Sequence, residues 1–97
     1  MDSQSDDRRR VLELLRSQHT FPGPYRFRIV TRPTDRATIL TAVGAAAGED
    51  VILDVSERPS RNGSYVAVHV DAQMGSAEDV LDIYDVIREL PEVLTVM

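Results

Sequence analysis

The chain has 97 residues, of which 42% are hydrophobic and 28% are charged, which is the composition of one small globular domain with a single core. It contains no cysteine, which excludes disulfides, zinc–thiolate centres and thiol catalysis. Its formal net charge of −5 opposes general nucleic-acid binding, because that binding needs cations to replace the counterions of phosphates. The first 20 residues lack the apolar run of a signal peptide and no segment has the length of a membrane span, so we expect a cytoplasmic protein.

The N-terminal 20 residues predict a flexible tail followed by a helix. We expect residues 1–5 to be disordered and a helix over Asp6–Gln18, since acidic residues suit the positive end of a helix dipole. A short apolar stripe on this helix would pack on the domain or on a partner; it consists of Val11, Leu12, Leu14 and Leu15. The segment Phe21-Pro22-Gly23-Pro24 ends the helix.

The next segment alternates as a half-buried strand does. Over Tyr25–Thr31, the side chains of Tyr25, Phe27 and Ile29 point one way, and those of Arg26 and Arg28 point the other way. Pro33 ends this strand, and a helix is predicted over Thr34–Ala47, with Thr34 as its N-cap. Its buried stripe is predicted to contain Ile39, Leu40, Val43 and Ala46 or Ala47.

Two further strands are predicted around an Asn-Gly turn at Asn62-Gly63. The second strand covers Val51–Ser56, in which Val51, Leu53 and Val55 alternate with Ile52, Asp54 and Ser56. The Asn-Gly pair favours a hairpin into a third strand over Ser64–Asp71. In that strand alternate valines face the core, which places Tyr65, Ala67 and His69 on the opposite face.

The last helix has the strongest periodicity in the chain. Ser76 is its predicted N-cap, with Asp79 three residues later in a capping-box arrangement. Its apolar stripe recurs at i, i+3, i+4 and i+7 and consists of Val80, Ile83, Tyr84 and Ile87. Pro91 ends the helix, and a short strand follows over Val93–Met97.

This order of elements predicts an α+β fold, the ferredoxin-like βαββαβ arrangement. Right-handed crossovers place both helices on one face of a four-stranded antiparallel sheet with strand order 4-1-3-2. We therefore divide the chain into residues 1–20, a flexible tail and N-terminal helix, and residues 21–97, the ferredoxin-like domain. The other face of the sheet would carry Arg26, Arg28, Tyr65, Ala67 and His69.

Three segments of the sequence resemble a known family. They are the aromatic-Pro-x-Pro-aromatic pattern at Phe21–Tyr25, the hairpin RNGSYVAVHV and the ending VLDIYDVIRELPEVLTVM. Together they resemble the YbeD-like family of small bacterial proteins of unknown function, over Leu12 to Met97. The resemblance implies a ferredoxin-like fold similar to regulatory ACT domains, and it names no catalytic residue. The chain has Thr31-Arg32-Pro33 where typical members have a glycine, which weakens the case for amino-acid sensing.

The polar clusters of the sequence predict no catalytic, cofactor-binding or metal site. His69 and Asp71 share a strand face, but a metal site needs three or four ligands and the sequence indicates no third one. Glu78, Asp82 and Asp85 have the spacing of a solvated helix face. The sequence also has no phosphate-binding glycine pattern, and we expect a protein that is not an enzyme.

The open sheet face is therefore the predicted functional region, and the sequence leaves three hypotheses for it. The first is a regulatory or adaptor module that binds a protein partner, or a second copy, through Arg26, Arg28, Tyr65 and His69. The second is an ACT-like sensor that binds an amino acid or another metabolite in a pocket between subunits around Thr31–Asp35. The third, RNA binding with Tyr65 and either Tyr25 or Phe27 as stacking aromatics, is opposed by the acidic composition.

Overall fold

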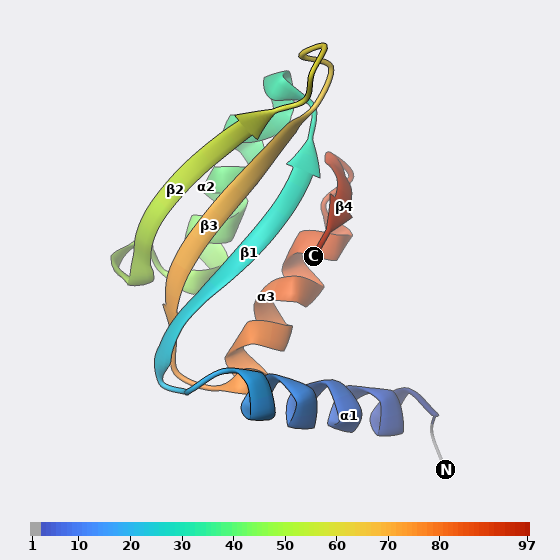
Figure 1. The fold of residues 1–97 in the computed structure, drawn as a ribbon, viewed down its shortest axis with the longest axis vertical. Coiled ribbons are helices and arrows are strands. Elements are labelled where there is room, and N and C mark those ends of the chain that lie inside the picture. The colour runs from blue at the N-terminus through green and yellow to red at the C-terminus, as the bar shows by residue number, and fades with distance from the viewer. Residues whose placement is uncertain (1–2) are drawn as a thin grey trace.

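The structure is a computed structural model that describes residues 3–97, and it contains one four-stranded sheet and three α-helices within that range. In chain order the elements are α1 (Ser3–Gln18), β1 (Gly23–Thr31), η1 (Pro33–Asp35), α2 (Arg36–Ala47), η2 (Glu49–Val51), β2 (Ile52–Pro59), β3 (Val66–Met74), α3 (Ala77–Glu89) and β4 (Val93–Val96). Every strand pair is antiparallel, and the strand order is β2-β3-β1-β4. Helices α2 and α3 lie on the same side of the sheet (Figure 1). The predicted α+β, ferredoxin-like fold and its strand order are confirmed.

The core lies between the sheet and these two helices, because β1 and β3 alternate between buried and exposed positions. Phe27 and Ile29 of β1 and Val68 and Val70 of β3 are at most 1% exposed. The opposing layer comes from the predicted helix stripes, of which these residues are buried: Ile39, Val43, Val80, Ile83, Tyr84 and Ile87. One-sided burial of the two central strands thus holds the sheet against the helices.

Aromatic contacts connect the proline-rich segment to this core. The Tyr25 ring lies 5.0 Å from the Phe27 ring, and the Tyr25 hydroxyl lies 2.8 Å from the Tyr84 hydroxyl. The ring of His19 stacks edge-on against Tyr25 at 4.9 Å. Burial, together with the hydrogen bond to Tyr25, raises the pKa of Tyr84. Tyr25 and Phe27 therefore face the helices, and neither lies on the open sheet face as a base-stacking residue would.

Helix α1 packs on its own domain across the beginning of α3 (Figure 1). Leu15 is buried against the core, and Leu12 is partly buried there, whereas Val11 and Leu14 are exposed. Arg8 lies 3.3 Å from Asp82 and 3.4 Å from Asp85, and Arg16 pairs with Glu78. The exposed carboxylates of α3 thus pair with arginines of α1. Helix α1 begins at Ser3, three residues before its predicted start at Asp6, and Met1 and Asp2 lie outside the described residues.

The edge strand β2 differs most from its prediction. It covers Ile52–Pro59, whereas Val51 belongs to η2. A register shift between Ile52 and Asp54 makes a bulge at Leu53, which leaves that side chain 57% exposed. The predicted alternation of Val51, Leu53 and Val55 is therefore wrong, since sequence alternation alone does not reveal a bulge.

The ends of other elements also differ from the predictions. Strand β3 begins at Val66, because residues 60–65 form the turn, in which Gly63 has φ = +75° and Ser60 N–H donates to the Tyr65 carbonyl at 2.9 Å. Thr34 lies in η1 and is not the N-cap of α2; Asp35 has that position without a side-chain capping bond. The predicted cap of α3 is confirmed, since Ser76 Oγ accepts a hydrogen bond from Asp79 N–H at 3.2 Å.

We expect Gly23→Ala to destabilise the domain by about 1–3 kcal/mol, because an added methyl group forces the surrounding backbone to move. A Cβ atom at Gly23 would overlap the Thr20 carbonyl oxygen. Urea unfolding followed by circular dichroism measures the loss. Gly44→Ala is the matched control, because its Cβ would lie 3.5 Å from Glu49, an ordinary contact. Equal stability of Gly23→Ala and the wild-type chain would contradict this account.

Candidate interaction surface

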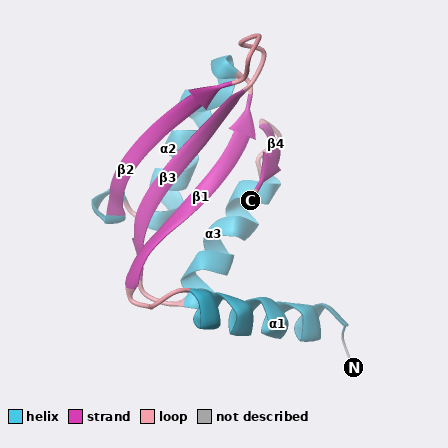
Figure 2. Cartoon of the chain, viewed as in Figure 1, coloured by secondary structure: helices cyan, strands magenta, loops and turns pink. Residues whose placement is uncertain are grey.

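The sheet face opposite α2 and α3 carries no other element among residues 3–97, and we call it the open face (Figure 2). Cross-strand register and alternation assign its residues. They are Pro24, Arg26, Arg28 and Val30 from β1; Ala67, His69, Asp71 and Gln73 from β3; Asp54, Ser56 and Arg58 from β2; and Thr95 from β4. Three arginines and two aspartates give this face a positive balance on a protein of net charge −5.

Arg26 is held in place by the residue directly opposite it. Its guanidinium donates to both carboxylate oxygens of Asp71, at 2.7 and 3.0 Å. This hydrogen bonding lowers the pKa of Asp71 and raises the pKa of Arg26. The two charges satisfy each other, so Arg26 contributes a fixed, mostly neutralised part of the surface.

Arg28 and His69 face each other in the next row of the open face. Burial of the ring lowers the pKa of His69, and the positive charges of Arg28 and Arg26 lower it further. The lowered pKa favours the neutral form of the His69 ring at pH 7. Arg28 makes no ion pair within residues 3–97, so its charge is available to a partner.

Tyr65 lies outside this group, in the turn before β3. Its side chain is 47% exposed, and its backbone N–H donates to Ser60 Oγ at 3.0 Å. Of the four candidate binding residues, the structure brings Arg26, Arg28 and His69 together on adjacent strands and places Tyr65 at the hairpin end of the sheet.

Strand β2 contributes residues to the open face that were not predicted from the sequence. Asp54, Ser56 and Arg58 lie opposite Asp71, His69 and Ala67, respectively. Their spacing of two residues is the pattern that could have identified them. The predicted strand ended at Ser56, however, and so excluded Arg58.

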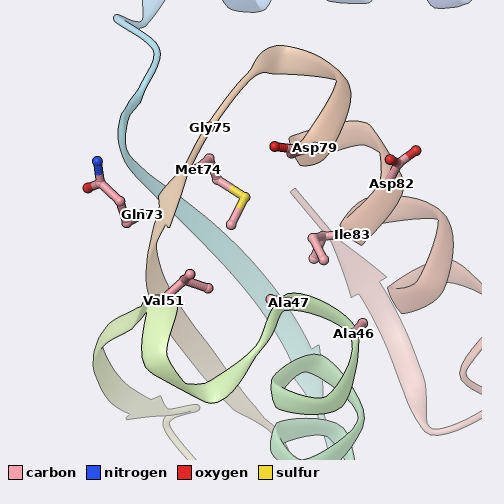
Figure 3. A pocket seen from close by; sticks show the side chains of 9 residues that line it. All are labelled: Ala46, Ala47, Val51, Gln73, Met74, Gly75, Asp79, Asp82 and Ile83. Atoms are coloured by element: carbon pink, nitrogen blue, oxygen red, sulfur yellow. The ribbon is translucent and has the colours of Figure 1, made fainter.

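A surface hollow of about 300 Å³ lies between the end of α2 and the beginning of α3 (Figure 3). Its wall is mainly apolar, with Ala47, Met74 and Ile83, and Asp79 and Asp82 lie at its rim. Asp82 already accepts a hydrogen bond from Arg8. Within the part of the chain that the structure describes, no three His, Cys, Asp or Glu residues are grouped to hold a metal ion.

Comparisons with known proteins identify a family and the fold. A family model described as "Protein of unknown function (DUF493)" matches residues 16–97, in agreement with the YbeD-like resemblance. The solution structure of protein HP0495 from H. pylori is similar, with a TM-score of 0.68 and 14% identity over 81% of this chain and 85% of that chain. The C-terminal domain of the MgtC protein from Mycobacterium tuberculosis has a TM-score of 0.65 and 13% identity over 76% of this chain and 82% of that one. No curated protein matches the chain.

No helix within residues 3–97 is long and apolar enough to cross a membrane.

We expect Arg28→Gln to raise the pKa of His69, because it removes the nearest opposing positive charge. The rise is partial, since burial of the ring is the larger cause and remains. An NMR titration of the His69 ring protons measures it, with Arg61→Gln in the exposed hairpin turn as a control of equal charge change. An unchanged pKa in Arg28→Gln contradicts the predicted coupling.

The same shift predicts how stability depends on pH. Because folding lowers the pKa of His69 below its ordinary 6.5, the unfolded chain takes up that proton first as the pH falls. The contribution of His69 to the free energy of unfolding is complete above pH 6.5 and is lost as the pH falls through the folded-state pKa. Urea unfolding of the wild type and His69→Gln between pH 7 and pH 5 measures it, and we expect the stability of His69→Gln to fall less over that range.

Proposed function

The chain belongs to the DUF493 family of proteins of unknown function, and we propose that this member is a non-enzymatic adaptor or regulatory module that binds a protein partner through its open face. The observation that carries the proposal is Arg28, an exposed cation with no acidic partner within residues 3–97, beside a neutral imidazole. We propose an acidic protein surface as the partner, with a carboxylate opposite Arg28.

The chemistry of the neighbouring groups supports such a partner. A guanidinium binds a carboxylate through two parallel hydrogen bonds, which provides direction as well as attraction. Neutral His69 adds a hydrogen-bonding group without a second charge that must be neutralised. Arg26 is already paired with Asp71, so a partner can cover it without leaving a charge unpaired. The row beside Arg28 on the open face pairs two uncharged residues, Val30 and Ala67, which add no charge that a partner must neutralise.

We expect Arg28→Glu to weaken the complex at least about tenfold, because it turns an attraction into a repulsion at the centre of the surface. Arg61→Glu changes the net charge equally from the exposed hairpin turn and is expected to leave binding nearly unchanged. Affinity isolation with the wild-type protein identifies a partner, and calorimetry of that purified partner with the wild type and each variant measures the effect.

Tyr65→Ala tests whether the surface extends to the hairpin end, where this exposed ring would add contact area. Circular dichroism checks that every variant remains folded. If the purified partner binds Arg28→Glu as tightly as it binds the wild type, the open face is not the binding surface and the proposal fails.

The hypothesis of an ACT-like metabolite sensor receives less support from the geometry. It needs a pocket between subunits around Thr31–Asp35; within one copy, Thr31 is buried and its hydroxyl donates to the Glu92 carbonyl at 2.8 Å. Residues 33–35 form η1, and the hollow between α2 and α3 is lined by other segments.

A thermal-shift screen with amino acids and other metabolites separates the two functions. A ligand at 100 times its dissociation constant adds about 2.7 kcal/mol of stability, which raises the melting temperature of a domain of this size by roughly 10 °C or more. We expect no such shift. A reproducible shift with one metabolite would favour the sensor over the adaptor.

A further inference from the structure

The outer edge of β2 has no partner strand within residues 3–97. The strand is the last in the order β2-β3-β1-β4, and every residue from Leu53 to Pro59 is exposed. Its apolar side chains Leu53 and Val55 are 57% and 39% exposed. An edge of this kind presents backbone N–H and C=O groups that can pair with another strand.

The hydrogen-bond pattern shows which backbone groups point outward. Ser60 N–H donates to the Tyr65 carbonyl, and the bonded pairs of an antiparallel ladder recur at every second residue. The groups of Asp54, Ser56 and Arg58 therefore point inward to β3, and those of Val55 and Glu57 point outward. Pro59 agrees with this assignment, since it has no N–H and occupies an outward position.

The charges of β2 are arranged symmetrically about Ser56. Asp54 lies two residues before Ser56 and Arg58 lies two residues after it, on the same open face. Neither residue makes an ion pair within residues 3–97, and Asp54 lies directly opposite the like-charged Asp71. This arrangement is complementary to itself when the strand is reversed.

We propose that β2 is a self-association edge that pairs antiparallel with β2 of a second copy about a two-fold axis at Ser56. In this register Asp54 faces Arg58 of the second copy, and Arg58 faces Asp54 of the second copy. Val55 and Glu57, whose backbone groups point outward, then exchange hydrogen bonds with Glu57 and Val55 of the other chain. One register therefore pairs the opposite charges and also pairs the outward-pointing backbone groups.

Neighbouring registers lack this match. If the two-fold axis lay at Glu57, Glu57 would face Glu57 of the second copy, and Pro59, which has no N–H, would lie opposite Val55. If the axis lay at Val55, Asp54 would face Ser56 of the second copy, and the charges of Asp54 and Arg58 would stay unpaired. Strand β4, the other edge, has only four residues and a register shift beside Thr31, so it offers a shorter template.

The resulting dimer is a continuous eight-stranded sheet, with the two open faces side by side and helices α2 and α3 of both copies on the other side. This inference does not depend on the proposed partner of Arg28, because Arg28 lies on β1, two strands from the new contact. A short strand–strand contact is smaller than the interface of a permanent dimer, so we expect the dimer to depend on protein concentration.

The test is charge reversal, measured by sedimentation equilibrium from about 10 μM to about 1 mM, the range in which such small interfaces dissociate. Asp54→Arg and Arg58→Asp each create two symmetric like-charge contacts, so each is expected to raise the dissociation constant about tenfold or more. The double variant Asp54→Arg/Arg58→Asp restores opposite charges and is expected to return the constant to within about threefold of the wild type.

Two controls keep the outcome specific. Arg61→Asp changes the same charge in the hairpin turn, and Arg28→Glu changes it on the open face; both are expected to leave the dimer intact. A wild-type chain that stays monomeric at about 1 mM overturns the proposal. A dimer that either single reversal leaves unchanged, or that the double variant does not restore, overturns it as well.

Discussion

The whole structure depends on the one-sided burial of β1 and β3. Phe27, Ile29, Val68 and Val70 supply a nearly fully buried apolar layer, and α2 and α3 cover it from one side. Because strand side chains alternate, burying one set necessarily exposes the other, so Arg26, Arg28 and His69 are fixed on the opposite face by the same packing. The core therefore positions the candidate interaction surface, although the two share no side chains.

Electrostatics then separates the arginines of the open face into different kinds. Arg26 is neutralised by Asp71, the residue directly opposite it, whereas Arg28 faces the neutral ring of His69. Arg58 lies on the edge strand β2, four residues after Asp54, the residue type that it would face in a second copy. The three arginines of the open face thus have different roles. Arg26 forms an ion pair within the chain, Arg28 is the proposed contact for an acidic partner, and Arg58 is the proposed contact for a second copy.

Helix α1 is an addition to the part of the chain that defines the family. The family match begins at residue 16, whereas α1 begins at Ser3. Its contact with α3 combines buried Leu15 with exposed ion pairs from Arg8 and Arg16, which contribute little individually in water. The open face and the β2 edge lie away from this contact, so α1 leaves both surfaces accessible (Figure 1).

Periodicity was sufficient to predict the helix stripes of α2 and α3 and the side on which Arg26, Arg28 and His69 lie, because a period of two or of 3.6 residues is a local property of the chain. The strand order followed from the order of the elements and the right-handedness of their crossovers. Periodicity could not reveal the bulge at Leu53, the turn that ends before Val66, or the pairing of Arg26 with Asp71, since each depends on which residue of a distant strand lies opposite. The docking of α1 likewise joins Leu15 to the core and sets Arg8 and Arg16 beside carboxylates of α3 that are more than 60 residues away in the chain, which no local pattern reveals. Tertiary structure thus decided the register and the charge pairing, and with them which cations remain available for a partner.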